Sequence, residues 1–214
     1  NDYKGALEGK DVKISVPPTL LISALGIIDD ITQAVTMDVK KPGNVLYIVG
    51  ATGDELGGSE YYAMMVTEVG RPFVGNRVPK VDAASAIQRY RAINNAIRNG
   101  YVASCHDCSD GGLGVAVAEI AFSGGYGIDV DLQRIPRLVE RTDKVLFSES
   151  NSRLLVEVPE AYCNAFERLI QGHYAKIGSV SSDDYLRIKD VSGKMRNPIH
   201  IQDLKDAWQS TMRW

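Results

Sequence analysis

The sequence predicts an α+β fold, with helices on both faces of a mixed sheet in three α/β/α layers. Segments of strand character and of helical periodicity follow each other in the order β-α-α-β-α-β-β-α-β-β. Residues 45–49 are apolar at every position, which is typical of a strand buried on both faces. Residues 128–132 alternate apolar and acidic side chains, as in a strand with one face in water.

The first half of the chain predicts extended chain followed by two helices. Residues 12–28 are extended in character, because two consecutive prolines prevent a helix there. Residues 60–68 have helical periodicity, and residues 71–81 form a loop with two prolines and a glycine. Asp82 is a good N-cap for a second helix, which Gly100 ends. Its apolar residues at helical spacing are Ala83, Ala86, Ile87, Tyr90, Ile93 and Ile97.

The second half predicts two further helices and several short strands. A helix over residues 112–122 has one apolar face, and a pair of glycines ends it. Another helix opens at Pro159, a residue that suits a first helical turn, and closes at Gly172. The predicted strands in this half are residues 101–106, 128–132, 154–158, 175–180 and 185–189.

The composition is that of an ordinary globular protein. The 214 residues are 44% hydrophobic and 24% charged, with a formal net charge of −3. We expect no nucleic-acid or membrane partner, because there is no basic stripe and no apolar run approaches the roughly 18 residues of a membrane span. Three cysteines, an odd count, argue against a disulfide framework and favour the reducing cytoplasm. We expect no signal peptide, because residues 1–5 contain no basic-then-apolar segment, and from the missing initiator Met we expect residues before Asn1.

Residues 104–113 are the most informative polar stretch. A predicted strand runs into two glycines and then a helix, whose N-terminal N–H groups would suit a phosphate. Asp107 and Asp110 would repel that phosphate unless Mg²⁺ lay between them. The structural alternative is an Asp or Ser N-cap with glycines that allow tight strand-to-helix packing. The ligand-binding candidates here are Asp107, Ser109, Asp110, Gly111 and Gly112.

Two other polar stretches are weaker candidates. Residues 53–61 are a glycine-rich loop that either contacts a ligand or supplies Ser59 as a helix N-cap. Residues 146–153 form a polar cluster between apolar segments, either an exposed turn or a binding loop. A hydrolase triad is not favoured, since the chain has no Gly-x-Ser-x-Gly nucleophile elbow. The candidates are Asp54, Glu55, Gly57, Gly58, Ser59, Glu149, Ser150 and Asn151.

Cys105 and Cys108 form a Cys-x-x-Cys pair, yet their surroundings favour packing over a metal or redox role. Structural zinc sites usually combine two such pairs, and Cys163 and the histidines have no matching spacing. A redox pair would begin a helix, whereas this one lies at the end of a predicted strand. We therefore expect both thiols to be buried, reduced and free of metal.

The three polar stretches together resemble the PurL family, the phosphoribosylformylglycinamidine synthases. The match consists of Gly53-Asp54-Glu55-Leu56-Gly57-Gly58-Ser59-Glu60-Tyr61, His106-Asp107-x-Ser109-Asp110-Gly111-Gly112-Leu113, Phe147-x-Glu149-Ser150-x-Ser152-Arg153 and Ile177-Gly178-x-Val180. It spans nearly the whole chain, and related aminoimidazole ribonucleotide synthetases, hydrogenase-maturation proteins and selenophosphate synthetases differ at the Asp-Gly-Gly turn. The resemblance implies a PurM C-terminal-domain-like fold, with residues 1–40 ending the preceding ATP-binding A2 domain and residues 41–214 forming the B2 domain.

The resemblance implies an ATP-dependent C–N ligase of purine biosynthesis. In that family ATP phosphorylates the amide oxygen of formylglycinamide ribonucleotide, and glutamine-derived ammonia displaces the phosphate. ATP and Mg²⁺ are the cofactors of the full-length enzyme. The implied partners are the remaining domains, a separate glutaminase subunit, a small bridging subunit and the small-molecule substrate.

The same resemblance places the catalytic His and the main substrate loops in the missing first half. We therefore expect no catalytic residue in this chain, and an isolated fragment that folds but is inactive. Asp110 is the one candidate for Mg²⁺. Glu149-Ser150-Asn151 resembles the counterpart of a substrate-binding Glu-Ser-Gln loop, with Asn151 in place of Gln. The alternatives are a structural domain without a nucleotide site and a kinase-like member of the superfamily.

Overall fold

The computed structural model describes residues 2–15, 21–69 and 77–210, and the chain divides into two compact units, Asn1–Ile31 and Thr32–Trp214. The first unit contains an antiparallel hairpin of β1 (Tyr3–Leu7) and β2 (Lys10–Ile14). Its turn residues Glu8 and Gly9 both have positive φ, as a tight hairpin turn requires. The apolar residues that follow are exposed, among them Leu21, Ile22, Leu25, Ile27 and Ile28.

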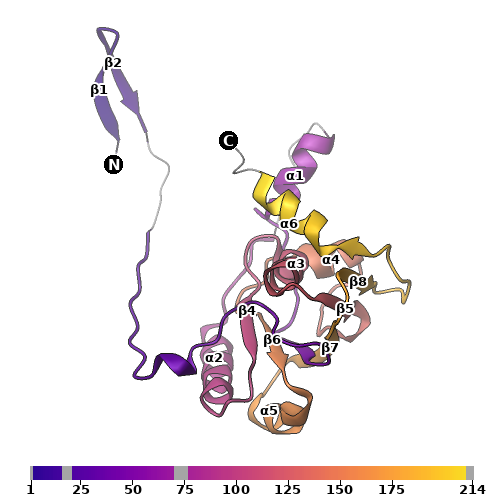
Figure 1. The fold of residues 1–214 in the computed structure, drawn as a ribbon. Coiled ribbons are helices and arrows are strands. Elements are labelled where there is room, and N and C mark those ends of the chain that lie inside the picture. The colour runs from indigo at the N-terminus through magenta and orange to yellow at the C-terminus, as the bar shows by residue number, and fades with distance from the viewer. Residues whose placement is uncertain (1, 16–20, 70–76, 211–214) are drawn as a thin grey trace. The chain divides into compact units, whose positions relative to one another are not determined.

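The second unit is built on a seven-stranded mixed sheet in the order β4-β6-β3-β7-β5-β8-β9 (Figure 1). Neighbouring strands are antiparallel except β5 and β8, which are parallel. The strands are β3 (Val45–Val49), β4 (Ser104–Asp107), β5 (Gly127–Asp131), β6 (Leu154–Val158), β7 (Tyr174–Ser181), β8 (Tyr185–Lys189) and β9 (Ile199–His200). The helices are α1 (Glu60–Val69), α2 (Ala83–Arg98), α3 (Gly112–Gly124), α4 (Thr142–Phe147), α5 (Cys163–Leu169) and α6 (Ile201–Ser210), and the 3-10 turns are η1 (Ile31–Gln33), η2 (Leu132–Arg134) and η3 (Glu160–Tyr162).

Two apolar cores lie on opposite faces of this sheet. One core joins the sheet to α3, α4 and α6, and the other joins it to α2 and α5 (Figure 1). β3 contributes to both cores, since Leu46 and Ile48 enter the first core and the alternate residues Val45, Tyr47 and Val49 enter the second. The predicted three-layer α+β fold is therefore confirmed, as is the burial of every residue of strand 45–49. The apolar face predicted for α3 is also buried in full: Leu113, Ala116, Val117, Ile120 and Ala121.

Several predicted details differ from the structure. In α2, Ile87 and Tyr90 are 49% and 48% exposed, because the face that meets the sheet and α5 is formed by Ala86, Ile93 and Ala96. The strand predicted at 101–106 is shifted to Ser104–Asp107, and the helix opened by Pro159 starts as a 3-10 turn. The helices α4 and α6 and strand β9 were not predicted. Of the predicted loop 71–81, residues 71–76 lie outside the described residues, and the rest has no regular structure.

The chain enters the sheet through a segment held by the buried carboxylate of Glu157 on β6. This carboxylate accepts hydrogen bonds from the backbone N–H of Lys40 at 2.9 Å and of Lys41 at 3.2 Å. It also accepts bonds from Asn44 Nδ2 at 2.8 Å and from Ser104 Oγ at 2.9 Å. Glu157 is 1% exposed, so these donors replace the water that a buried carboxylate loses. The predicted boundary between residues 40 and 41 stays a prediction.

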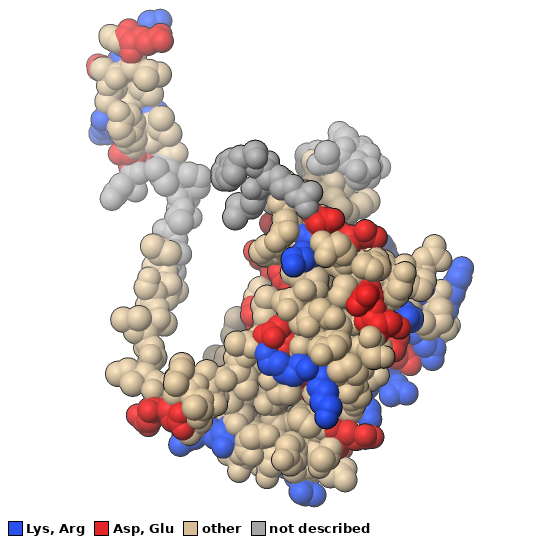
Figure 2. Space-filling view, viewed as in Figure 1, with Lys and Arg blue, Asp and Glu red and all other residues tan. Residues whose placement is uncertain are grey.

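Within the described ranges, no helix combines the length and the apolar character that a membrane crossing would need. On the face drawn in Figure 2, acidic and basic side chains are interspersed over the second unit. Such mixed charge is common on protein surfaces that repel neither cations nor anions strongly.

Candidate functional site

The three polar stretches of the sequence meet at one end of the sheet. β3 and β4 both pair antiparallel with β6, on its two sides. The last residues of β3 and β4 therefore lie beside the first residue of β6, at the same end of the sheet. Residues 50–59 leave β3 there, residues 108–112 leave β4, and residues 148–153 lead into β6. We call these three segments the loop cluster.

Glu149 is at the centre of the loop cluster. Its Oε1 accepts a hydrogen bond from the N–H of Gly111 at 2.8 Å and another from the N–H of Glu60 at 3.0 Å. These two N–H groups belong to the starts of α3 and α1, where unpaired donors and the helix dipole favour an anion. The position that the sequence suggested for a phosphate is thus taken by a carboxylate of the chain itself.

The Asp-Gly-Gly turn does not have the side-chain cap that the structural alternative predicted. The N-cap of α3 is Gly111, with φ of 74° and no side-chain hydrogen bond, so neither Ser109 nor Asp110 caps the helix. Gly112 has φ of 64°, and a Cβ there would lie 2.5 Å from the Ser148 carbonyl oxygen. Both positive φ values favour glycine, and an added Cβ would collide with Val115 of α3 at Gly111 and with the neighbouring loop at Gly112.

The carboxylates of this turn differ in their partners. Asp107 accepts a hydrogen bond from the Ser109 hydroxyl, which lowers the pKa of the Asp107 carboxyl. His106 lies between Asp107, 3.4 Å from its Nδ1, and Glu119 of α3, 2.8 Å from its Nε2. Glu119 also accepts the Trp208 indole N–H at 3.1 Å, so His106 helps to join β4 to α3 and α6. Across the residues that the structure describes, no three His, Cys, Asp or Glu side chains form a metal-binding group.

The loop after β3 is tied to its neighbours by both side chains and backbone. Asp54 forms an ion pair with Lys144 at 2.8 Å, and Glu55 Oε1 accepts the N–H of Lys80 at 3.1 Å. Ser59 Oγ accepts the N–H of Tyr62 at 3.3 Å, so Ser59 caps α1. A Cβ on Gly57 would lie 2.5 Å from the carbonyl oxygen of Arg77, which explains the glycine. Gly58 has φ of 75° and needs the conformational freedom of glycine.

A cavity of about 630 Å³ lies beside this loop. This volume is within the usual range of small-molecule pockets. Its charged side chains are those of two acidic residues, Asp54 and Glu55, and two basic residues, Arg77 and Lys80. Carboxylate oxygens suit Mg²⁺, and the basic groups suit phosphate. The lining is completed by Ala51, Gly53, Val78 and Leu138.

The loop before β6 is largely buried. Ser150 Oγ accepts the N–H of Gly53 at 2.9 Å, and only 3% of Ser150 is exposed. Asn151 is exposed in the adjoining turn. Arg153 is 1% exposed and makes hydrogen bonds within the loop cluster. Sequence reasoning placed Arg153 in a motif but not among the site residues, since nothing in the sequence signals that this arginine is buried.

The Cys-x-x-Cys pair packs in the two apolar cores, and the expected burial holds fully for Cys108 and in part for Cys105. Cys108 is 4% exposed and Cys105 is partly buried, and both are free cysteines. Burial raises the pKa of the Cys105 thiol to about 12 and that of the Cys108 thiol to about 11. Both thiols are therefore protonated at neutral pH, the form that is neither nucleophilic nor a good metal ligand.

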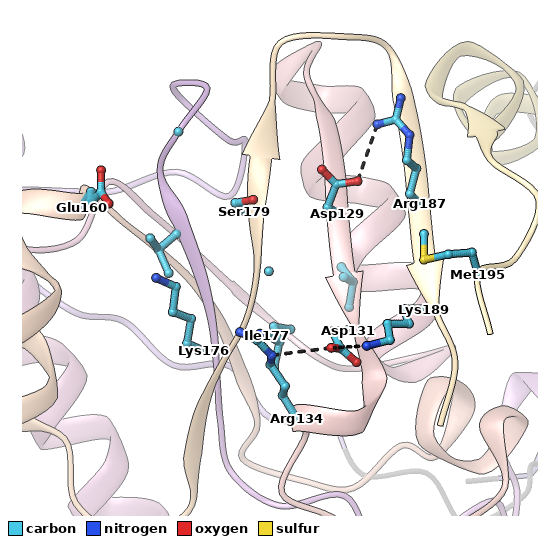
Figure 3. A pocket seen from close by; sticks show the side chains of 14 residues that line it. Asp129, Asp131, Arg134, Glu160, Lys176, Ile177, Ser179, Arg187, Lys189 and Met195 are labelled. Carbon is cyan, nitrogen blue, oxygen red and sulfur yellow. Dashed lines mark hydrogen bonds and ion pairs between the residues drawn. The ribbon is translucent and has the colours of Figure 1, made fainter. Parts of the chain in front are cut away.

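A second polar pocket, of about 550 Å³, lies on the sheet outside the loop cluster. Figure 3 shows Asp129 and Asp131 of β5 beside Arg187 and Lys189 of β8. Asp129 and Arg187 are 3.5 Å apart, and Asp131 and Lys189 are 3.3 Å apart. The period-two pattern of residues 128–132 and 185–189 was the signal that could have revealed this surface. These two ion pairs join β5 to β8 across the pocket, and we assign no ligand to it.

The fold and the loop cluster match a known domain family. Residues 41–191 match the family described as AIR synthase related protein, C-terminal domain, and the chain belongs to that family. It is 33% identical over 204 residues to the phosphoribosylformylglycinamidine synthase subunit PurL of Methanothrix thermoacetophila, and 31% identical over 201 residues to that of Nostoc sp.. These alignments cover 93% and 91% of this chain but 25% of each relative, so the chain spans about a quarter of their length. The resemblance to PurL predicted from the three motifs is confirmed.

Solved structures show the same fold. PurL from T. maritima complexed with FGAR has a TM-score of 0.71 at 20% identity, over 81% of this chain and 30% of the other. The same protein complexed with ATP has a TM-score of 0.62 at 22% identity, over 81% and 27%. PurLQS from Thermotoga maritima has a TM-score of 0.66 at 20% identity, over 81% and 28%. The hydrogenase maturation protein HypE in complex with ATP has a TM-score of 0.56 at 19% identity, over 78% and 53%.

Proposed function

We propose that this chain is the C-terminal domain of a phosphoribosylformylglycinamidine synthase. The parent enzyme is an ATP-dependent C–N ligase that converts formylglycinamide ribonucleotide, ATP and glutamine-derived ammonia into the amidine. The observation that carries the proposal is the convergence of the three PurL-like stretches into one loop cluster. The identity of 31–33% to proteins named PurL supports it. The proposed partners are the other domains of the enzyme, a glutaminase subunit and a small bridging subunit, in the cytoplasm.

Two places at or beside the loop cluster were candidates for a nucleotide: the start of α3 and the cavity beside residues 53–55. A phosphate on the N–H of Gly111 does not fit, because Glu149 already uses that donor. The cavity beside residues 53–55 fits better, since Arg77 and Lys80 can pair with phosphates while Asp54 and Glu55 offer oxygens to Mg²⁺. When bound to the full-length enzyme, ATP supplies the phosphoryl group that activates the amide oxygen. The role of this chain is to bind and orient, because the family's catalytic His lies outside it.

Isothermal titration of the 214-residue chain with Mg-ADP tests the binding role. We expect a weak saturable signal that Lys80→Ala reduces, whereas Lys205→Ala on α6 leaves it unchanged. No signal at millimolar Mg-ADP would contradict a nucleotide site in this chain. In a separate assay with ATP, ammonium and the ribonucleotide, we expect the chain alone to form no amidine. Measurable amidine would contradict the assignment of catalysis to the missing half.

A purely structural domain of the same enzyme is the second candidate. This candidate is favoured by the contacts of Glu149 with the N-termini of α1 and α3. The carboxylate accepts hydrogen bonds from N–H groups that would otherwise be free to bind a phosphate. The titration separates the two proposals, because a structural domain binds no Mg-nucleotide. In that case the full-length enzyme would keep its nucleotide affinity when Lys80 is replaced by Ala.

A further inference from the structure

Arg153 holds the backbone on both sides of Glu149. Its Nε donates a hydrogen bond to the carbonyl oxygen of Ser150 at 3.0 Å, and its Nη2 donates to the carbonyl oxygen of Ser148. These carbonyls flank Glu149 in the chain. The third guanidinium nitrogen, Nη1, donates to Thr52 Oγ1 at 3.0 Å and so reaches the loop after β3.

The surroundings of Arg153 are shaped to the guanidinium group. Arg153 is the largest fully buried side chain of the described residues, and burial lowers the pKa of its guanidinium. Its hydrogen bonds go to neutral oxygens, while the negative charges of Glu55 and Glu149 act on it from a greater distance. Gly50, with φ of 109°, makes room for it, because a Cβ there would lie 2.9 Å from Arg153 Cγ. A buried cation that contacts only carbonyl and hydroxyl oxygens is costly, so packing alone does not explain it.

Only a planar fork of donors can serve these acceptors at once. A lysine ammonium is a compact charge on a flexible stem, and it has no rigid fork that fits two carbonyl oxygens and a hydroxyl together. With these two carbonyls held, the backbone conformation at Glu149 is fixed. In this conformation the Glu149 carboxylate points toward the N–H groups of Gly111 and Glu60. The linkage thus runs from Arg153 through Glu149 to the starts of α1 and α3.

We propose that Arg153 is the positioning residue of the loop cluster, which sets the Glu149 carboxylate so that it joins the N-termini of α1 and α3. The inference deepens the proposed function, because it identifies what preorganises the loops beside the proposed nucleotide cavity. Its test reads backbone amides and requires no nucleotide. Absence of Mg-ADP binding would therefore count against the proposed function and leave this inference standing.

The test is amide hydrogen exchange of the 214-residue chain by NMR, with Arg153→Lys as the variant. We expect the amides of Gly111 and Glu60 to exchange at least about tenfold faster, because each loses a bond to a charged acceptor. Amides of β3 should change by a smaller factor. The matched control is Arg89→Lys. Arg89 Nε also donates a hydrogen bond to this loop, to the carbonyl oxygen of Ser152 at 3.1 Å, but Ser152 is not adjacent to Glu149 in the chain. The control should leave both amides as they are.

If Arg153→Lys accelerated amide exchange equally at Gly111, at Glu60 and in β3, the proposal would be overturned. Arg153 would then only stabilise the fold as a whole. A cycle with Glu149→Ala, which removes the acceptor, adds a second criterion. If Arg153 acts through Glu149, the double variant exchanges at Gly111 no faster than Glu149→Ala alone, and independent, multiplying effects would overturn the inference. If Arg153→Lys does not fold, Thr52→Val removes one of the three hydrogen bonds and should accelerate the same two amides. Unchanged exchange in that variant would equally overturn it.

Discussion

Glu157→Gln should lower the free energy of unfolding of the second unit by about 3 kcal/mol. In the native chain the carboxylate accepts bonds from two backbone N–H groups, those of Lys40 and Lys41, and from the side chains of Asn44 and Ser104. The variant keeps one acceptor oxygen, and its NH₂ group faces two of these donors. The Ser104 hydroxyl can reverse and accept a bond from the new NH₂, whereas a backbone N–H cannot.

The N–H of Lys40 donates to both oxygens, at 2.9 Å to Oε2 and at 3.1 Å to Oε1, so in Glu157→Gln it keeps only one acceptor, which is neutral. A hydrogen bond to a charged group contributes about 1.5–3 kcal/mol, and the remaining bonds weaken because the charge is gone. For a domain of this size each kcal/mol shifts the melting temperature by roughly 2–4 °C, so we expect a fall of about 6–12 °C.

Urea unfolding followed by circular dichroism measures this effect, with the slope m compared between variants. The matched control is Glu160→Gln, the same change at an exposed position nearby, which should alter stability by less than about 0.5 kcal/mol. A Glu157→Gln variant as stable as the control would refute the view that this carboxylate anchors the entering segment.

Three further predictions concern the turn and the thiols. Gly111→Val should cost about 2–3 kcal/mol in thermal unfolding, because φ is 74° and the new Cβ would lie 2.2 Å from Val115 Cγ2; a loss below about 0.5 kcal/mol would contradict this. Asp110→Asn should change the melting temperature by less than about 1 °C, because Gly111 and not Asp110 is the N-cap of α3. If Asp110 binds Mg²⁺, the same variant of the full-length enzyme should bind Mg-nucleotide more weakly. A clear loss of stability would show a structural role instead. The buried thiols of Cys105 and Cys108 have pKa values raised from 9.0 to about 12 and about 11, so the unfolded chain releases their protons first and the free energy of unfolding should fall as pH rises above 9. A Cys105→Ala/Cys108→Ala variant should show a shallower fall in alkaline urea titrations, and an identical slope or stoichiometric zinc in the purified protein would go against the expected packing role.

Local patterns in the sequence predicted the elements that depend on residues close together in the chain. The buried strand β3 follows from five consecutive apolar residues, and the N-cap of α2 follows from Asp82, whose carboxylate accepts the N–H groups of Ala84 and Ser85. The helix α4 was missed because it has only six residues, and the last two of them belong to the stretch interpreted as a polar turn. The exposure of Tyr90 was also missed, since helical spacing shows which residues share a face but not which side of that face meets the sheet.

The amino-acid sequence by itself determined the fold class, most strands and helices, and the resemblance to PurL, because periodicity, caps and motifs are properties of short segments. Only the tertiary structure decided that Glu149 meets Gly111 and Glu60, and that Arg153 and Glu157 are buried. These contacts depend on β6 lying between β3 and β4, a strand order set by long-range pairing. No local pattern specifies which strands pair, so the segments that form the loop cluster could be named from the sequence but not brought together by it.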